Sequence, residues 1–560
     1  MTIVETSIRG LAQMLDEGEV TAVSLVKECL DRIQRYDRSG PCLNAVPVLN
    51  PTAMEEAKAS DARRAKGHAL GRLDGIPYTA KNSYRAKGLT VASGSPAFAD
   101  LVASDDAFAI ERLRAAGAIL IGLTNMPPMA NGGMQRGLYG RAESPYNRNY
   151  LTAAFASGSS NGSGTATASS FAAFGLGEET WSSGRAPAAN NGLCAYTPSR
   201  GVISVRGNWP LVPTMDVVVP HTRSMADMLD ILDVIVADDP NTRGDLWRSQ
   251  PWVHIPKASD HRPVSYADLT QGASLQGKRF AVPAMYINQD AEAGSNAKGG
   301  IGGPTGQKIE TRASMIDLFN AARRVIEAEG GAVVVTDFPV VTNYESDRVG
   351  APSIKTRNLV TPEYLRREIM DLSVWAWDDF LRSNNDPKLN RLAQVDGAQI
   401  FPQPKGALPD RYVGFDDDIA TYPEHARIHP VGSFLDIPEL EDGFRGLEET
   451  RKIDLEDWMD RQNLDAVIFP AVADIGPVDA DVNPVSAALA WRNGVWVANG
   501  NLAIRHLGIP TVTVPMGMLA DIGMPAGLTF AGRGWDDVNL LQLAAAFERT
   551  GQYRVPPTLD

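Results

Sequence analysis

The sequence has few of the features that mark secreted, metal-binding or membrane proteins. Its 560 residues include three cysteines, and the spacing of Cys29, Cys42 and Cys194 matches no zinc pattern. So few cysteines in a long chain predict a reducing compartment. No apolar run approaches the roughly 20 residues that span a bilayer, and the N-terminal 15 residues lack the basic-then-apolar pattern of a signal peptide. We therefore expect a cytoplasmic protein without a membrane partner.

Positive charge is also scarce. The chain has 53 Lys and Arg against 67 Asp and Glu, which gives a formal net charge of −14. An acidic chain repels phosphate backbones, and no Lys/Arg cluster forms a local basic patch, so a nucleic-acid partner is not expected. Hydrophobic residues at 44% and charged residues at 21% are ordinary for a globular protein, which argues against extensive disorder.

Helical and strand patterns alternate along the chain. Thr21 can cap a helix over 21–37, in which apolar residues recur at helical spacing. A short strand is predicted within 74–84, and a helix over 106–117 is followed by a buried strand over 118–125. This alternation indicates an α/β fold. Further strands are predicted at 277–283, 332–339, 464–471, 509–517 and 526–532, and further helices at 51–67, 315–331 and 537–550.

One long stretch departs from that alternation. Between about 344 and 451 aromatic, proline and acidic residues mix without clear periodicity, except for a predicted helix over 363–381. We interpret 340–455 as an insertion that forms a lid or one wall of a pocket.

Two neighbouring segments are crowded with small hydroxyl and glycine residues. They are ASGSSNGSGTATASS at 156–170 and ETWSSGRAPAANNG at 179–192. Gly/Ser clusters are usually linkers, but the first segment lies between apolar stretches and runs into a predicted helix of small side chains. A glycine-rich turn before a helix presents free backbone N–H groups, which bind anions or stabilise a developing negative charge.

Two common motifs are nearly matched in the chain. Gly158–Gly162 fits the G-x-S-x-G nucleophile elbow, which requires a preceding core strand and a late catalytic histidine. The preceding stretch at 147–157 is a weak strand pattern, and His506 is the one histidine in the last hundred residues. The stretch 272–279 resembles a phosphate loop, but Arg279 replaces the required Ser or Thr and the strand follows the loop. Neither motif is favoured.

Histidine offers no metal site by its spacing. His221 is interpreted as structural, at the entry of a helix. His425 and His429 have i, i+4 spacing, but no carboxylate pattern completes a ligand set. We expect no metal and no cofactor, and the aromatic cluster at 375–380 is interpreted as core packing.

Three motifs stand in a defined order. Gly75–Lys81 reads G-I-P-Y-T-A-K, Ser157–Ser163 reads S-G-S-S-N-G-S, and Trp181–Pro187 reads W-S-S-G-R-A-P. The separation from Ser159 to Ser183 is 183 − 159 = 24 positions. With T-N-M at 124–126, Y-T-P-S-R-G-V-I-S at 196–204 and G-I-P-T-V to F-A-G at 508–532, the chain resembles the amidase signature family over nearly its whole length.

The resemblance implies a fold and a catalytic triad. The fold would be a single large α/β domain over 1–560, with a mixed twisted sheet covered by helices and a signature core at 75–205. Ser183 would be the nucleophile, Ser159 a proton bridge held by a cis peptide, and Lys81 the base. A free lysine has a pKa of about 10.4, but full burial lowers the pKa by up to about 3–5 units. The apolar approach to Lys81 is consistent with burial.

The oxyanion hole would be formed by backbone N–H groups of Thr180, Trp181 and Ser182, with Ser183 as a further candidate. One such donor typically contributes about 3–4 kcal/mol in the transition state. Backbone atoms alone are used, so the side chains of this segment can vary.

This sequence departs from the family pattern in that segment. Trp181 and Ser182 stand where the family has glycines, Glu179 where it has Asp, and Asn161 where it has glycine. Tryptophan is costly at positive φ, so we expect an allowed conformation in which the indole either lines the pocket, favouring a flat or aromatic substrate, or fills core space. Arg185 is expected to pair with Glu179 or another acid and brace the loop.

The sequence therefore predicts a hydrolase that cleaves the C–N acyl bond of a linear amide through an acyl-enzyme. The expected substrate is a small amide, with aryl amides among the candidates, and a homodimer is one candidate for its assembly. Three alternatives stay open: a carbamate or urea-type hydrolase, an amidotransferase subunit that needs partner subunits, and a non-catalytic binding protein of the same fold.

Overall fold

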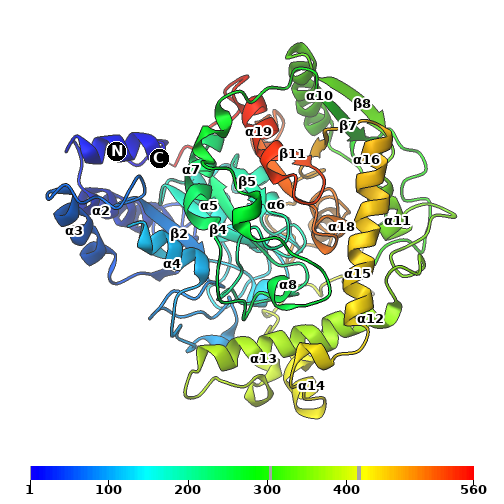
Figure 1. Ribbon diagram of the computed structural model, residues 1–560, viewed down its shortest axis with the longest axis horizontal. Helices are drawn as coiled ribbons and strands as arrows, with labels where there is room; N and C mark the ends of the chain where they lie inside the picture. The colour runs from blue at the N-terminus through cyan, green and yellow to red at the C-terminus, as the bar shows by residue number, and fades with distance from the viewer. Residues whose placement is uncertain (1, 302–304, 413–417, 560) are drawn as a thin grey trace.

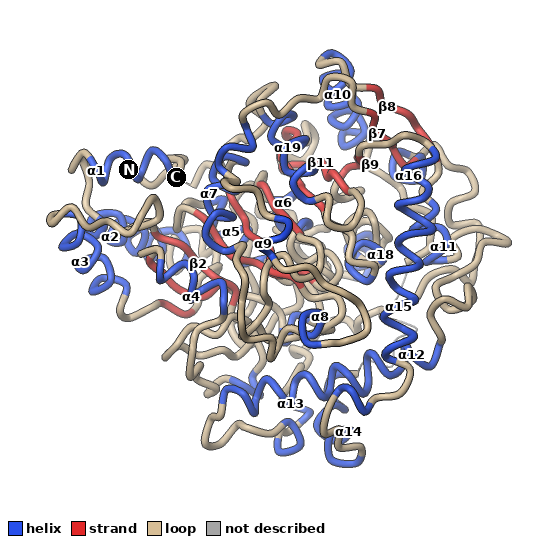
Figure 2. The backbone as a smooth tube through the Cα atoms, viewed as in Figure 1, coloured by secondary structure: helices blue, strands red, loops and turns tan. Residues whose placement is uncertain are grey.

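The computed structural model describes residues 2–301, 305–412 and 418–559, and these form one α/β domain around a mixed sheet of 11 strands (Figures 1 and 2). The strands are β1 (Val48–Leu49), β2 (Pro77–Lys81), β3 (Ile119–Thr124), β4 (Phe174–Glu179), β5 (Cys194–Thr197), β6 (Val217–Thr222), β7 (Arg279–Pro283), β8 (Ala332–Thr336), β9 (Ala466–Pro470), β10 (Thr511–Met518) and β11 (Pro525–Ala531). Their order across the sheet is β1-β3-β2-β4-β6-β5-β10-β11-β9-β7-β8. Strands β2, β3 and β4 are parallel, as are β7, β8 and β9, and the remaining pairs are antiparallel. The predicted fold class is confirmed.

Helices cover both faces of the sheet (Figure 2). They are α1 (Ile8–Asp16), α2 (Ala22–Arg32), α3 (Ala53–Arg64), α4 (Phe108–Ala115), α5 (Asn161–Ala168), α6 (Arg185–Asn190), α7 (Met225–Ile235), α8 (Leu246–Ser249), α9 (Ala258–His261), α10 (Ala313–Ala328), α11 (Pro339–Glu345), α12 (Pro362–Arg367), α13 (Ser373–Asn384), α14 (Tyr422–Ile428), α15 (Leu440–Arg451), α16 (Asp457–Arg461), α17 (Pro484–Ala490), α18 (Ala503–His506) and α19 (Asp537–Glu548). The Thr21 side chain caps α2 by accepting a hydrogen bond from the Ser24 N–H at 3.0 Å. None of the helices in the described ranges has both the length and the apolar composition needed to cross a lipid bilayer.

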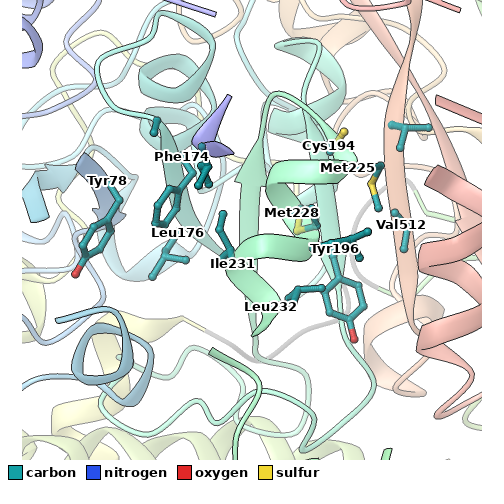
Figure 3. Packing of buried hydrophobic residues seen from close by; sticks show 14 of the residues in the cluster. Tyr78, Phe174, Leu176, Cys194, Tyr196, Met225, Met228, Ile231, Leu232 and Val512 are labelled. Atoms are coloured by element: carbon teal, nitrogen blue, oxygen red, sulfur yellow. The ribbon is translucent and has the colours of Figure 1, made fainter. Parts of the chain in front are cut away.

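Strands β2, β3 and β4 are buried along their whole length, as expected for parallel strands covered on both faces. Figure 3 shows Tyr78, Phe174 and Leu176 on the face that α7 covers, with Ile231 of α7 pointing at Leu176. The Tyr78 and Phe174 rings stack with centroids 5.3 Å apart. Side chains alternate along a strand, so residues 79 and 81 of β2 point to the opposite face.

Helix α5 lies on that opposite face and approaches it very closely. A Cβ atom on Gly175 would lie 2.6 Å from Thr167 Oγ1 and 2.7 Å from Ser163 Oγ, and one on Gly162 would lie 2.4 Å from the Asn125 nitrogen. All eight residues of α5 are buried. The small side chains of the serine-rich segment are therefore a packing requirement, and they bring α5 against the sheet at the end of β2.

The segment between β8 and β9 is helical where the structure describes it. Helices α11 to α16 lie along one side and the lower edge of the molecule in Figure 1. The predicted helix over 363–381 is present as α12 and α13, joined by a π-helical turn at Glu368–Leu372. The interpretation of 340–455 as an insertion includes 413–417, which lie outside the described residues.

Candidate active site

Lys81 is the last residue of β2, and its amine reaches the serine-rich segment before α5. Lys81 Nζ and Ser159 Oγ are hydrogen-bonded at 2.7 Å. The lysine is 1% exposed and Ser159 is fully buried. Burial lowers the pKa of Lys81, because the charged amine loses its hydration, and the nearby carboxylates of Glu178 and Asp216 partly oppose that effect.

Ser183 lies in the loop between β4 and α6, and this loop contacts the segment that holds Ser159. The Ser160 N–H donates to the Ser183 carbonyl at 3.2 Å, and the Ser182 hydroxyl donates to the Ser157 carbonyl at 2.6 Å. Within the described part of the chain the Ser183 hydroxyl makes no hydrogen bond, and the residue is 3% exposed. The structure thus brings the two serine-rich segments side by side at the Lys81 amine.

The expectation of a cis peptide at Ser159 is wrong. Every peptide bond in the described ranges is trans, and the contact between Lys81 and Ser159 forms on that backbone. The glycine at position 158 is therefore not explained by a cis peptide. A Cβ atom on Gly158 would lie 2.6 Å from the Ala153 Cβ and 2.6 Å from the Ala154 carbonyl oxygen. Close packing against 153–154 accounts for glycine there.

An ion pair braces the loop around Ser183. Glu179 Oε2 accepts the N–H groups of Gly184 at 3.0 Å and Arg185 at 2.9 Å, and Glu179 Oε1 pairs with the Arg185 guanidinium. That guanidinium also donates to the Trp181 carbonyl at 2.7 Å. Both side chains are fully buried. The predicted Arg185–Glu179 pair is confirmed, and it joins the start and the end of the loop.

His221 joins the same loop to α5. It lies within β6 rather than at a helix entry, so that part of the sequence interpretation is wrong. Its Nε2 is 2.9 Å from the Gly184 carbonyl oxygen and its Nδ1 is 3.0 Å from Ser163 Oγ. Burial lowers the pKa of His221 to about 4, so the ring is neutral near pH 7 and acts as a hydrogen-bonded spacer.

Sequence reasoning missed two buried carboxyl groups behind Lys81. Glu178 Oε2 lies 3.6 Å from Lys81 Nζ, and burial raises the pKa of Glu178. Asp216, just before β6, accepts a hydrogen bond from the Thr180 hydroxyl at 2.6 Å, and burial raises its pKa to about 7. The adjacent glutamates at 178–179 could have indicated this, because successive side chains of a strand point to opposite faces of the sheet. Glu179 pairs with Arg185, and Glu178 therefore faces a different partner.

The Trp181 indole lies in a cluster of aromatic rings and not in open solvent. Its ring centroid is 5.9 Å from that of Trp496 and 6.0 Å from that of Tyr412, and Tyr412 is 5.0 Å from Trp491. Trp181 keeps an allowed backbone conformation, as expected, with no positive φ. The Tyr412 hydroxyl donates to the Ala156 carbonyl at 2.6 Å, so the segment between β8 and β9 reaches the serine-rich segment that holds Ser159.

The competing motifs find no support in the geometry. No strand precedes Gly158 in 147–157, where the one β-bridge is at Tyr150. The His506 Nε2 lies 3.1 Å from Glu368 and its Nδ1 2.7 Å from the Tyr344 hydroxyl, so His506 is bonded to the α11–α13 region. Across the described ranges no three His, Cys, Asp or Glu side chains gather as metal ligands.

Comparisons with known proteins give one consistent result. A family model described as Amidase matches residues 24–296. The chain is 27% identical to a glutamyl-tRNA(Gln) amidotransferase subunit of Exiguobacterium sibiricum, over 99% of this chain and 100% of that protein. It is 25% identical to the corresponding mitochondrial amidotransferase subunit of Homo sapiens, over 98% and 94%.

Solved structures of the same fold align over nearly the whole chain. The peptide amidase of Stenotrophomonas maltophilia matches with a TM-score of 0.74 and 24% identity, over 100% of this chain and 99% of that one. A bacterial aryl acylamidase of the amidase signature family matches with a TM-score of 0.68 and 18% identity, over 97% and 96%. At these identities the likeness establishes the fold.

We expect Arg185→Ala to lower the free energy of unfolding by about 3–5 kcal/mol, because it leaves the Glu179 carboxylate buried without its partner. Urea-induced unfolding followed by circular dichroism measures the change. Arg445→Ala is the matched control, because Arg445 pairs with Glu441 on the exposed face of α15 and such pairs contribute about 0–1 kcal/mol. Equal losses in both variants would show that the Arg185–Glu179 pair does not brace the loop.

Proposed function

We propose that the chain is a serine amidohydrolase of the amidase signature family, which cleaves the C–N acyl bond of a linear amide through an acyl-enzyme. The observation that carries this proposal is the 2.7 Å hydrogen bond between the buried Lys81 amine and Ser159. The loop of Ser183 lies directly against that serine segment. An alcohol is a weak nucleophile until a base removes its proton, and this arrangement supplies a base and a path.

The proton path follows from the charge state of Lys81. Burial lowers the pKa of its amine, so a neutral fraction is available to accept a proton from the Ser159 hydroxyl. Ser159 in turn takes the proton of Ser183, whose Oγ attacks the carbonyl carbon. When the C–N bond breaks, the proton returns through Ser159 to the departing nitrogen. A water molecule then uses the same path to release the acid from the acyl-enzyme.

The oxyanion of the tetrahedral intermediate would be held by backbone donors before the nucleophile. The N–H groups of Gly184 and Arg185 are already bonded to Glu179. We therefore assign the oxyanion hole to the N–H groups of residues 180–183, which the buried Glu179–Arg185 pair keeps in place. Fixed donors in a site with little water stabilise a developing charge strongly, since they need no reorganisation.

The aromatic cluster supports a flat, apolar group on the substrate. Trp181 of the Ser183 loop packs against Tyr412 and Trp496, and Tyr412 packs against Trp491, so the surroundings of the loop are apolar and aromatic. We propose an aryl amide or a similarly apolar amide as the preferred substrate class.

A second candidate is an amidotransferase subunit, and one observation favours it: the full-length relatives of Exiguobacterium sibiricum and Homo sapiens are named as such subunits. Such a protein would apply the same three residues to an amide donor and pass ammonia to a partner. The apolar rings packed around Trp181 favour the hydrolase, because the charged α-amino and α-carboxylate groups of glutamine are costly to bury beside apolar side chains.

We expect Ser183→Ala to lose all measurable turnover and all labelling by a fluorophosphonate, because the hydroxyl that forms the adduct is gone. Mass spectrometry of the digested protein locates the adduct. Ser274→Ala is the control, since Ser274 lies in an exposed loop. A wild-type protein that stays unlabelled at Ser183 while folded would instead identify a non-catalytic member of the fold.

We expect Lys81→Ala to lower kcat/KM by about 10²–10⁴-fold, the usual contribution of a general base. The decrease is measured at neutral pH, with circular dichroism spectra of both proteins to verify that the variant is folded. A folded variant that retains a near-native rate would show that Lys81 is not the base.

The two candidate functions differ in substrate, and a panel of aryl amides, aliphatic amides, carbamates and glutamine separates them. We expect the isolated chain to release amine fastest from the aryl amides, because the aromatic cluster binds their rings. Release is followed as amine or ammonia under matched conditions. Glutamine hydrolysis that exceeds aryl amide hydrolysis, or that arises only with added partner subunits, would favour the amidotransferase candidate.

A further inference from the structure

The carboxyl group of Glu178 lies next to the proposed base, and the proton path from Ser183 through Ser159 to Lys81 does not use it. Its Oε2 is 3.6 Å from Lys81 Nζ, and the Glu178 side chain also accepts hydrogen bonds from the Ser83 hydroxyl and the Asn208 amide. Glu178 is 8% exposed. Two neutral donors hold this carboxyl group against the amine, so its position is fixed by the fold.

Other ionisable groups near Lys81 are either occupied or neutral. Glu179 is paired with Arg185. His221 is neutral near pH 7, because burial lowers its pKa to about 4. Asp216 is bonded to Thr180 and to the Leu211 N–H. Among the described residues, Glu178 is the one acid within ion-pair distance of the Lys81 amine.

The Glu178 carboxyl group also borders a small cavity behind the site. The cavity has a volume of about 20 Å³ and is lined by Glu178, Asn208, Trp209 and Asp216, among others. A cavity of that size has room for one water molecule. Burial raises the pKa of Glu178, whereas the Lys81 amine and the two neutral donors lower it and so favour the ionised carboxylate.

We propose that Glu178 is a positioning residue: its carboxylate anchors the Lys81 amine beside Ser159 and makes the amine keep its proton to a higher pH than burial alone would allow. The inference rests on the proposed function, in which Lys81 must be neutral to act. When Lys81 accepts the proton that left Ser183, the carboxylate stabilises the new ammonium. Glu178 therefore makes Lys81 a stronger base. It also means that the amine becomes neutral, and so able to accept a proton, only at a higher pH.

The sign of the pH effect follows from this arrangement. Burial lowers the pKa of Lys81 and the Glu178 carboxylate raises it. Without the carboxylate the burial effect acts nearly alone, so the amine becomes neutral at a lower pH. The acid limb of the pH–rate profile then moves to lower pH, and the plateau above it falls because the base is weaker. A purely structural role for Glu178 would lower stability without moving the limb in this direction.

The experiment compares wild type, Glu178→Gln and Glu178→Asp. The rate constant for fluorophosphonate modification of Ser183 is measured by mass spectrometry from about pH 5 to pH 10, which covers the expected range of a perturbed lysine. An opposite charge within a few ångströms shifts a pKa by about 1–3 units. We expect the acid limb of Glu178→Gln to lie about 1–3 pH units below that of the wild type, with a lower plateau. Glu178→Asp, which keeps the charge but withdraws it from the amine, should lie between them.

Glu548→Gln is the matched control, because it makes the same change at a half-buried carboxyl group far from Lys81. Glu548 lies in α19, accepts the Met225 N–H at 3.0 Å, and has its pKa raised to about 7 by burial. It has no hydrogen bond or ion pair with Lys81, Ser159 or Ser183, so its acid limb should coincide with that of the wild type.

The possible outcomes separate this inference from the proposed function. An acid limb of Glu178→Gln that stays in place or moves to higher pH would overturn the role of Glu178 while leaving the triad intact. Wild-type protein that is not modified at Ser183 at any pH would overturn the proposed function, and this inference with it. Should Glu178→Gln not fold, the Asp variant decides: a limb at lower pH supports the inference, and an unchanged limb overturns it.

Discussion

A lysine amine with almost no access to water is the constraint on which the site depends. A charged amine is costly in such a place, and a neutral amine is a base. Burial of Lys81 requires close packing around it, and the sequence meets that requirement with glycine and small hydroxyl residues at the contact between α5 and the sheet. The same small residues bring the Ser159 hydroxyl to the amine at 2.7 Å. Small side chains in the 156–170 segment are therefore needed both for close packing against the sheet and for the contact between Ser159 and Lys81.

The loop that carries Ser183, the proposed nucleophile, depends on a second buried charge, which is held in a different way. The Glu179 carboxylate satisfies two backbone N–H groups and the Arg185 guanidinium, so its charge is fully compensated within a few residues. Distant residues add to this local brace: His221 bonds to the Gly184 carbonyl, and the Arg185 guanidinium donates to the Asn501 carbonyl at 3.2 Å. The loop can then carry a large indole at position 181, where the backbone stays in an allowed region.

Much of this organisation could be predicted from the sequence, because it depends on local patterns. Capping by Thr21, the buried strand before Thr124 and the Arg185–Glu179 pair all follow from residues close together in the chain. Ordered motifs likewise predicted the fold class. Contacts between distant segments were not accessible: the reach of Glu178 to Lys81 depends on the register of β2 and β4, and the reach of Tyr412 to Ala156 joins residues 256 positions apart. The cis peptide was inferred from resemblance alone, and it was wrong.

The contact of Tyr412 with the serine-rich segment that holds Ser159 has a consequence for how such a protein can diversify. The residues proposed for acyl transfer all come from the stretch between β2 and α6, whereas Tyr412 belongs to the helical stretch between β8 and β9. Part of the aromatic cluster proposed for substrate preference is thereby encoded far from the residues proposed for the reaction. Mutational drift in the helical stretch can change the side chains packed against the serine-rich segment while Lys81, Ser159 and Ser183 stay the same, so one scaffold can acquire new preferences without rebuilding its chemistry.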